Sequence, residues 1–217
     1  MKRYVFALLW MLMASTASAG ILFTEDFEGG VDEDVIPVGL IAGTQFEVVA
    51  GNVDHIKDDA VPPNPYAMMC GAGGSCIDTT GSGSRGEIRS IVEIDFLPGL
   101  YYLSFSLQGW RDFNNNTASA NIQVILPGLA DRVFSRSPSN GPYDRERIEF
   151  FVDAAQSVKL TFRDLGGSAG YAGAILDDVE IGTSTPEPSS LLLVLPALGA
   201  LAVLRRRAAT KACPRAA

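Results

Sequence analysis

The residues around Trp110 combine an aromatic ring with side chains that donate and accept hydrogen bonds. Trp110 is followed directly by Arg111 and Asp112, and three asparagines come shortly after them. A flat apolar face beside such groups suits a sugar, whose C–H surface stacks while its hydroxyls bind polar atoms. Trp110, Arg111 and Asp112 are therefore candidate ligand-binding residues, with Tyr143 and Tyr171 as lesser candidates. The alternative is that Trp110 fills one end of a hydrophobic core.

Two acidic residues fall among apolar neighbours at the spacing of a strand. Period two places Asp177 on the apolar face of residues 174–181, and it places Glu25 on the apolar face of residues 21–28. A carboxylate on an apolar face must be paired, hydrogen-bonded, metal-bound or neutralised, because burying it alone is very costly. Each of these acids is therefore expected to have a defined partner.

Two cysteines are spaced for a short disulfide. Cys70 and Cys76 are separated by Gly-Ala-Gly-Gly-Ser, a loop flexible enough to bring them together in an oxidising compartment. The spacing is not C-x-x-C, and the single histidine, His55, is remote in sequence, so a redox pair or a metal site is not favoured. Any Ser-His-Asp triad would also have to use His55, which argues against most hydrolytic chemistry.

Residues 81–86 match the pattern G-x-G-x-x-G, but they do not precede a helix. The alternating stretch 87–96 follows, whereas a dinucleotide site needs a helix N-terminus to hold the pyrophosphate. Dinucleotide binding is therefore rejected, and residues 71–86 are expected to form a glycine-rich linker between strands.

Apolar residues recur with period two through the middle of the chain, which is typical of half-buried strands. The regular and less regular candidates are 87–96, 101–108, 121–126, 147–152, 158–163, 174–181, 21–28 and 45–49. Pro98 and Gly99 predict a hairpin between the first two. Because no convincing amphipathic helix is found, the sequence predicts an all-β, antiparallel β-sandwich, most simply a jelly roll.

Residues 1–19 have the pattern of a secretory signal peptide. Two cations precede the apolar run 4–13, and an Ala-x-Ala site ends at Ala19. Ten apolar residues are too few to cross the ~30 Å hydrocarbon core of a bilayer, so cleavage is expected rather than anchoring. The globular domain is then expected to span residues 20–185.

Residues 186–217 have three parts that suit a membrane tail. Pro186, Glu187 and Pro188 lead into the uncharged run 191–204, and Arg205, Arg206 and Arg207 follow. A helix over 189–204 would be about 24 Å long at ~1.5 Å per residue, which is short but competent to cross a membrane. The arginines favour the cytoplasmic side, so residues 20–185 would lie outside that membrane.

This tail closely resembles the PEP-CTERM sorting signal of Gram-negative bacteria over residues 185–207. The resemblance implies that an exosortase, a membrane cysteine protease-transpeptidase, recognises Pro186, Glu187 and Pro188. Residues 191–204 would then be a transient anchor and the three arginines a stop. The protein would pass through the inner membrane to the cell envelope or extracellular matrix. The last ten residues, 208–217 with Cys213, extend beyond the usual pattern. The alternative is a permanent single-pass anchor.

The domain also resembles, more loosely, galactose-binding-like jelly rolls and carbohydrate-binding modules. The resemblance is carried by residues 26–29, by 98–105 with Gly109, and by 175–179. It implies that the first and last strands lie close together, in which case Glu25 or Glu28 and Asp177 could ligate a structural calcium ion. The alternative is that these acids lie at strand ends in water or accept backbone N–H bonds.

Charge excludes one class of partner. The chain has 17 basic and 25 acidic residues; without the two cations of 1–19, and the five cations and one acid of 186–217, the domain keeps 10 against 24, a net charge of −14. Nucleic-acid binding needs a net positive charge, so it is excluded.

Taken together, the sequence features lead to the hypothesis of an exported, non-enzymatic surface or matrix protein that binds polysaccharide. The alternatives are a purely structural spacer and a small glycan-active hydrolase or lyase that uses two carboxylates.

Overall fold

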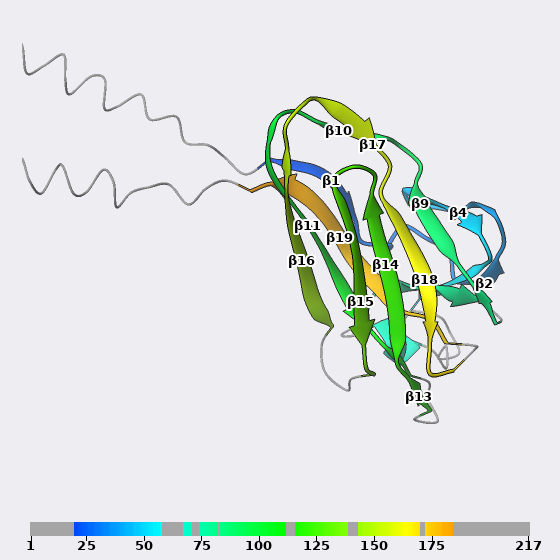
Figure 1. Ribbon diagram of the computed structural model, residues 1–217. Coiled ribbons are helices and arrows are strands. Elements are labelled where there is room, and N and C mark those ends of the chain that lie inside the picture. The colour runs from blue at the N-terminus through cyan, green and yellow to red at the C-terminus, as the bar shows by residue number, and fades with distance from the viewer. Residues whose placement is uncertain are drawn as a thin grey trace, which may run out of the picture. The chain divides into compact units, whose positions relative to one another are not determined.

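The computed structural model describes residues 20–57, 67–70, 74–81, 83–111, 116–138, 143–169 and 172–184. Gly20–Ser184 forms one compact unit in which two antiparallel sheets enclose a hydrophobic core (Figure 1). The prediction of an all-β, antiparallel sandwich is confirmed. The predicted signal peptide, residues 1–19, and the sorting tail, residues 186–217, lie outside the described residues. Within the part described, no helix is long and apolar enough to cross a membrane.

The described strands form two large sheets and three small ones. The larger sheet has the order β16 (Asp144–Val152), β11 (Gly99–Gln108), β19 (Ile175–Thr183), β6 (Ser75–Asp78), β5 (Val53–Lys57) and β2 (Glu33–Ile36), and β1 (Ile21–Glu25) also pairs with β19. The second sheet has the order β15 (Ala130–Arg136), β14 (Ala120–Leu126), β18 (Thr161–Gly167), β9 (Glu87–Ser90), β4 (Phe46–Ala50) and β3 (Gly39–Leu40). The two-stranded sheets pair β10 (Ile94–Phe96) with β17 (Gln156–Val158), β12 (Trp110–Arg111) with β13 (Thr117–Ala118), and β7 (Thr80–Gly81) with β8 (Ser84–Arg85).

The strand pairs are nested as in a jelly roll. In chain order, β6 pairs with β19, β9 with β18, β11 with β16, and β14 with β15, so that each hairpin encloses the next. The outermost and third pairs lie in the larger sheet, and the second and innermost pairs lie in the other. A long hairpin folded over itself in this way is the jelly-roll arrangement. The predicted topology is therefore confirmed.

The core between the sheets is built by alternation of side chains. In β14, the side chains at positions 121, 123 and 125 point outward and are half-buried, while Ile122, Val124 and Leu126 point inward and are buried. Aromatic rings join the layers: the Phe105 ring lies 5.3 Å from that of Phe162, which lies in the opposite sheet. Edge-to-face contacts of this kind add to the burial of apolar area. The core fixes the two sheets against each other, and the side chains on their outer faces remain available to bind a ligand.

The predicted strand 87–96 and its hairpin with 101–108 are wrong. The strand is broken after Ser90, and β9 and β10 belong to different sheets. At the break, the Ser90 hydroxyl donates to the carbonyl of Val92 at 2.9 Å, which turns the chain. The partners of β11 are β16 and β19, so Pro98 and Gly99 carry the chain from one sheet to the other.

The predicted linker over residues 71–86 is also wrong. It contains β6, β7 and β8, and all four residues of β6 are buried. The prediction missed β6 because it is covered on both faces, so that apolar and polar residues do not alternate. The predicted strand 158–163 is divided as well, between β17 and β18.

Candidate functional site

A bulge in β19 decides which side chains reach the outer face of the larger sheet. Asp178 has a φ of 49°, and the register with β11 shifts between Ser104 and Ser106. A bulge adds one residue and reverses the facing of the residues beyond it. Asp177 therefore lies opposite Ser106, on the outer face, although Val179 points into the core. The prediction that these two share a face is wrong.

Tyr102 lies at the centre of a layered array on this outer face. It is directly opposite Gly182 of β19, where an added Cβ would lie 2.7 Å from the Tyr102 hydroxyl oxygen. The guanidinium carbon of Arg147, from β16, lies 4.0 Å from the centroid of the ring. The absence of a side chain at Gly182 thus lets the ring lie on the sheet and support a cation above it.

Carboxylates flank this ring on both sides. The Tyr102 hydroxyl donates a short hydrogen bond to Glu180 of β19, and this hydrogen bond raises the pKa of the phenol. On the other side, Arg147 Nη2 lies 3.2 Å from Glu149 Oε1. We call Tyr102, Arg147, Glu149 and Glu180 the tyrosine array, and it draws on β11, β16 and β19.

A second arginine, Arg145, holds the side chains next to the tyrosine array on the same face. Arg145 donates to the Asp178 carbonyl at 2.8 Å through Nη1 and to the Ser104 hydroxyl at 2.9 Å through Nη2. The Ser106 hydroxyl donates to Asp178 Oδ2 at 3.1 Å. Cross-strand hydrogen bonds of this kind position side chains that would otherwise sample many rotamers. The row next to the tyrosine array is therefore ordered before any ligand arrives.

The tyrosine array offers a ligand both hydrogen-bond donors and acceptors. The side chains of Arg147 and Glu149 are 48% and 55% exposed, whereas that of Glu180 is 30% exposed. Guanidinium groups donate in a planar fork, and carboxylates accept. A neutral molecule with several adjacent hydroxyls satisfies both kinds of group at once. The exposure of Arg147 and Glu149 leaves these groups accessible to a ligand from solvent.

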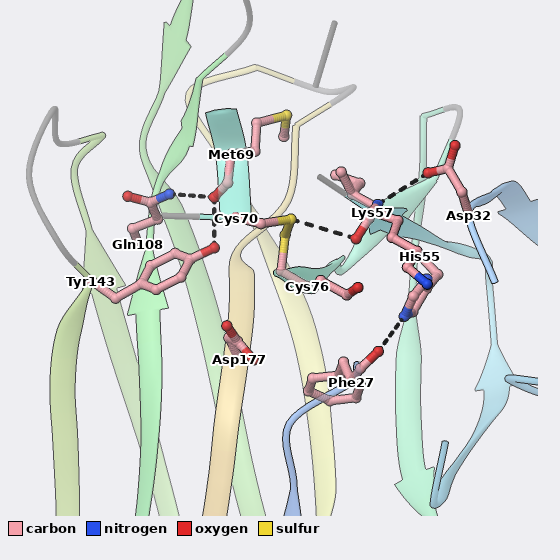
Figure 2. Close-up of a disulfide and its surroundings, with 12 residues drawn as sticks. Phe27, Asp32, His55, Lys57, Met69, Cys70, Cys76, Gln108, Tyr143 and Asp177 are labelled. Atoms are coloured by element: carbon pink, nitrogen blue, oxygen red, sulfur yellow. Dashed lines mark hydrogen bonds between the residues drawn. A yellow bond between two sulfur atoms is a disulfide. The ribbon is translucent and has the colours of Figure 1, made fainter. Parts of the chain in front are cut away.

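A second apolar cluster covers one end of the same outer face (Figure 2). At its centre is the predicted disulfide between Cys70 and Cys76, which is present and has a Cα–Cα distance of 5.3 Å. Cys70 ends the 3-10 turn η1 (Ala67–Cys70), and the Met69 carbonyl of this turn accepts hydrogen bonds from the Gln108 amide and the Tyr143 hydroxyl, both at 2.6 Å. The disulfide and these two bonds hold the turn against the sheet.

One of the predicted ligand-binding residues, Trp110, is a member of this cluster. Trp110 is 7% exposed and packs with the disulfide, and Arg111 follows it in β12. The burial of Trp110 is as the packing alternative expects, although this cluster lies outside the sandwich core, and ligand binding by Trp110, Arg111 and Asp112 stays a prediction. Asp112 and Tyr171 lie outside the described residues. The Tyr143 ring is half-buried at the rim of the cluster.

Asp177 lies near the Tyr143 ring and the disulfide (Figure 2). It is 8% exposed, and burial together with the nearby charge of Asp178 raises the pKa of the Asp177 carboxyl to about 7. Glu28 and Asp26 act in the same direction, while the N–H of Asp178 donates to Asp177 Oδ1 at 2.7 Å and opposes the shift. Burial also raises the pKa of Tyr143, which the charge of Asp177 reinforces. The Asp177 carboxyl can therefore change its charge near neutral pH.

The predicted calcium ligands, Glu25 or Glu28 together with Asp177, each accept backbone N–H groups. Glu25 is 6% exposed, and its two oxygens accept the backbone N–H groups of Phe27 at 2.8 Å and Gln45 at 2.5 Å. Glu28 instead accepts the N–H of Ser75 at 2.7 Å. No group of three or more His, Cys, Asp or Glu side chains could hold a metal ion within the described ranges. The contacts of Glu25 match the backbone alternative, and calcium binding stays a prediction.

Other acids are buried away from the surface. Asp78 and Asp164 are 3% and 4% exposed, and burial raises the pKa of both. Asp164 accepts a short hydrogen bond from Thr80, and Asp78 accepts the N–H of Thr80 at 2.9 Å. The ring of His55 is 1% exposed, and its Nε2 contacts the Phe27 carbonyl at 2.9 Å. None of these groups is placed to meet a large substrate.

Comparison with known proteins gives distant structural similarities. No family model matches the chain, and no curated protein matches it. The chain is similar to the CBM22-1 xylan-binding domain of Paenibacillus barcinonensis Xyn10C, with 10% identity over 79% of this chain and 100% of that one, and a TM-score of 0.42.

Two further solved structures are similar to the same degree. One is the carbohydrate-binding module CBM6cm-2 of Cellvibrio mixtus lichenase 5A, with 11% identity over 77% of this chain and 100% of that one, and a TM-score of 0.40. The other is an exo-β-1,3-galactanase of Phanerochaete chrysosporium, with 14% identity over 77% of this chain and 30% of that one, and a TM-score of 0.42. At these values the similarities assign no ligand or activity to this chain.

Proposed function

We propose that this protein is an exported, non-enzymatic surface or matrix protein whose β-sandwich binds polysaccharide on the outer face of its larger sheet. The observation that carries the proposal is the tyrosine array, in which the Arg147 guanidinium lies over Tyr102 between two carboxylates. Donors and acceptors fixed on an open sheet surface can bind the hydroxyls of an extended glycan. The domain's net negative charge favours neutral glycans over acidic ones.

The position of the acids supports binding rather than catalysis. A glycosidase needs two carboxylates on either side of a bond, about 5 to 9.5 Å apart, in a site that a substrate can enter. Asp78 and Asp164 lie inside the domain, and Glu180 is engaged by the Tyr102 hydroxyl. The proposal therefore assigns the exposed polar groups to recognition, and it expects no release of reducing ends from a bound glycan.

The binding test is a substitution that removes the exposed donor of the array. Arg147→Ala deletes the guanidinium above Tyr102 and leaves the sheet backbone unchanged. Loss of one charge-assisted contact costs about 1.4 kcal/mol, so the Kd for a bound neutral polysaccharide is expected to rise about tenfold. A glycan array first identifies the ligand, and isothermal titration with the full-length protein in detergent then measures both variants.

The matched control is Arg132→Ala. Arg132 is an exposed arginine on β15 of the other sheet, where its Nη1 donates to the Asp131 carbonyl at 3.1 Å. This variant is expected to bind as the parent does. Equal weakening by both substitutions would indicate a non-specific charge effect, and an unchanged Kd in Arg147→Ala would refute the proposed site. Binding to no glycan on the array would favour the structural-spacer alternative.

Export and sorting form the second part of the proposal, and the sequence of the two ends supports them. The pattern of residues 1–19 suits a cleaved signal peptide, and Pro186, Glu187 and Pro188 with the apolar run and arginines suit an exosortase substrate. The Cys70–Cys76 disulfide is consistent with an oxidising compartment. The protein would then act in the cell envelope or extracellular matrix.

A further inference from the structure

Exposed apolar side chains gather at one end of the outer face, next to the tyrosine array. Leu100 and Phe151 are directly opposite each other in β11 and β16, and they are 37% and 67% exposed. Leu97, which is 69% exposed, lies in the turn before β11, where its backbone N–H and carbonyl both bond the Tyr101 hydroxyl at 3.2 and 2.9 Å. Ile21, which is 63% exposed, lies opposite Gly182 in the adjacent strand pair. We call Ile21, Leu97, Leu100 and Phe151 the apolar rim.

Both ends of the compact unit lie at this rim. β1 begins and β19 ends at the same end of the sandwich (Figure 1). The N–H of Gly20 donates to the Thr183 hydroxyl at 2.7 Å, and the N–H of Ser184 donates to the Leu100 carbonyl at 2.8 Å. Ser184, at the end of the compact unit, therefore lies directly beside Leu100, one of the exposed residues of the rim.

The sequence beyond Ser184 limits how far the rim can lie from a bilayer. Six residues, 185–190, separate it from the uncharged apolar run 191–204. The seven residue steps from Ser184 to Leu191 reach about 25 Å when fully extended, and the polar headgroup layer of one leaflet takes up about 5 to 8 Å of this length. When residues 191–204 lie in a membrane, the end of β19 must therefore lie within about 20 Å of the membrane surface.

We infer that the apolar rim is a lipid-contacting surface of the anchored protein. The inference goes beyond glycan binding, but it rests on the proposed membrane tail. Exposed Leu, Ile and Phe side chains partition into the interfacial region of a bilayer, where burial of their apolar area is favourable. The glycan site needs polar groups around its aromatic ring, whereas the cross-strand partner of Phe151 is Leu100. The acidic domain is repelled by anionic lipid, so the rim contacts zwitterionic lipid.

Tryptophan substitution tests lipid contact at the rim in the full-length protein. Phe151→Trp and, separately, Leu97→Trp are reconstituted in phosphatidylcholine vesicles with brominated acyl chains, and the emission of the parent protein is subtracted. Bromine quenches tryptophan only at short range, so at least a twofold loss of the added emission and a blue shift are expected at both positions. Flotation of the vesicles checks that the chain is membrane-bound.

The control is Val133→Trp. Val133 is 56% exposed and lies in β15, on the sheet that does not contain the rim. Its emission is expected to be unchanged by brominated lipid. Equal quenching at positions 133 and 151, quenching at neither rim position, or a chain that does not float with the vesicles would overturn the inference. A rim tryptophan that responds to a soluble glycan but not to lipid would also overturn it, and glycan binding itself would remain intact.

Discussion

The bulge in β19 places Asp177 in surroundings that raise the pKa of its carboxyl to about 7. The bulge at Asp178 places Asp177 on the outer face, and Tyr143 and the disulfide turn lie over that end of the face. Water is largely excluded there, and the charges that act on Asp177, those of Asp178, Glu28 and Asp26, are all negative. Ionisation is therefore disfavoured both by desolvation and by repulsion.

This environment predicts that the domain is more stable in mild acid. The pKa of Asp177 is about 7 in the folded state, above its ordinary value of 3.8, so its contribution is complete below about pH 4 and is lost as the pH rises through 7. Half-buried Asp54 and buried Asp78 and Asp164, whose pKa values are also raised by desolvation, act with the same sign. The melting temperature is expected to fall by several degrees between pH 5 and pH 8.

Asp177→Asn checks the assignment because an amide cannot ionise. The variant should lose less melting temperature than the parent between pH 5 and pH 8, as measured by calorimetry. Glu47→Gln is the control: hydrogen bonding to Arg89 lowers the pKa of Glu47 below its ordinary 4.5, so its contribution is lost only as the pH falls below that value, and this variant should follow the parent's profile between pH 5 and pH 8. A parent and an Asp177→Asn variant with parallel pH profiles would rule out the role given to Asp177.

At the scale of elements, β15 is an edge strand, and its arginines protect it against pairing with a strand of another molecule. Arg132 and Arg136 each donate through Nη1 to the preceding backbone carbonyl, at 3.1 and 2.8 Å. Arg136 also pairs with Asp144, at 3.3 Å, and closely with Glu146, both in β16. Cations on an exposed edge discourage the addition of a strand from another molecule. Two edge strands of different sheets are thereby joined along one side of the sandwich.

Removal of this protection is expected to promote self-association. Arg132→Val places a strand-forming apolar residue beside Val133, which is 56% exposed, so the edge becomes open to pairing. Sedimentation velocity should show a larger dimer fraction at tens of micromolar protein. Arg163→Val is the matched control, because β18 is paired on both sides although Arg163 loses its 2.6 Å ion pair with Glu87. Association by the control alone, or by neither variant, would contradict the edge role.

Strands were predictable where one face is buried and the other is wet. Alternation defines β14, which begins one residue earlier than predicted, and β16, which extends three residues further toward its N-terminus. β6 gives no such signal because Ile77 faces the sandwich core while Cys76 faces the second cluster. β15 gives none because its side chains are largely exposed. Periodicity reports a difference between two faces, and it fails when both faces are alike.

The tyrosine array was not predictable, because its members come together through register. Tyr102 follows another tyrosine, and only the pairing of β11 with β16 and β19 brings it beside Arg147 and Glu180. Alternation indicates which side chains point outward, but it does not indicate which strands become neighbours. The disulfide was predictable for the opposite reason, since only five residues lie between its cysteines in the sequence.

For the whole molecule, the sorting hypothesis makes a prediction about the fate of the tail. A variant in which Pro186, Glu187 and Pro188 are all replaced by Ala is expected to accumulate as a membrane-bound precursor in an exosortase-containing host. The parent is expected to yield a chain shortened near residue 188, which intact-mass measurement of the envelope and matrix fractions detects. Thr185→Ala is the control and should be processed as the parent is. Release of an identically shortened chain from the triple variant would contradict recognition of these residues.

The nested strand order has a mechanical consequence for a tethered protein. The proposed tether would follow the end of β19, which lies inside the larger sheet, with β11 on one side and β6 and β1 on the other. Its hydrogen bonds run perpendicular to the strand. A pull along β19 therefore loads the bonds to these neighbours in shear and all together, instead of unzipping them one after another. A force on a bound polysaccharide would therefore act on β19, which is hydrogen-bonded to neighbours on both sides.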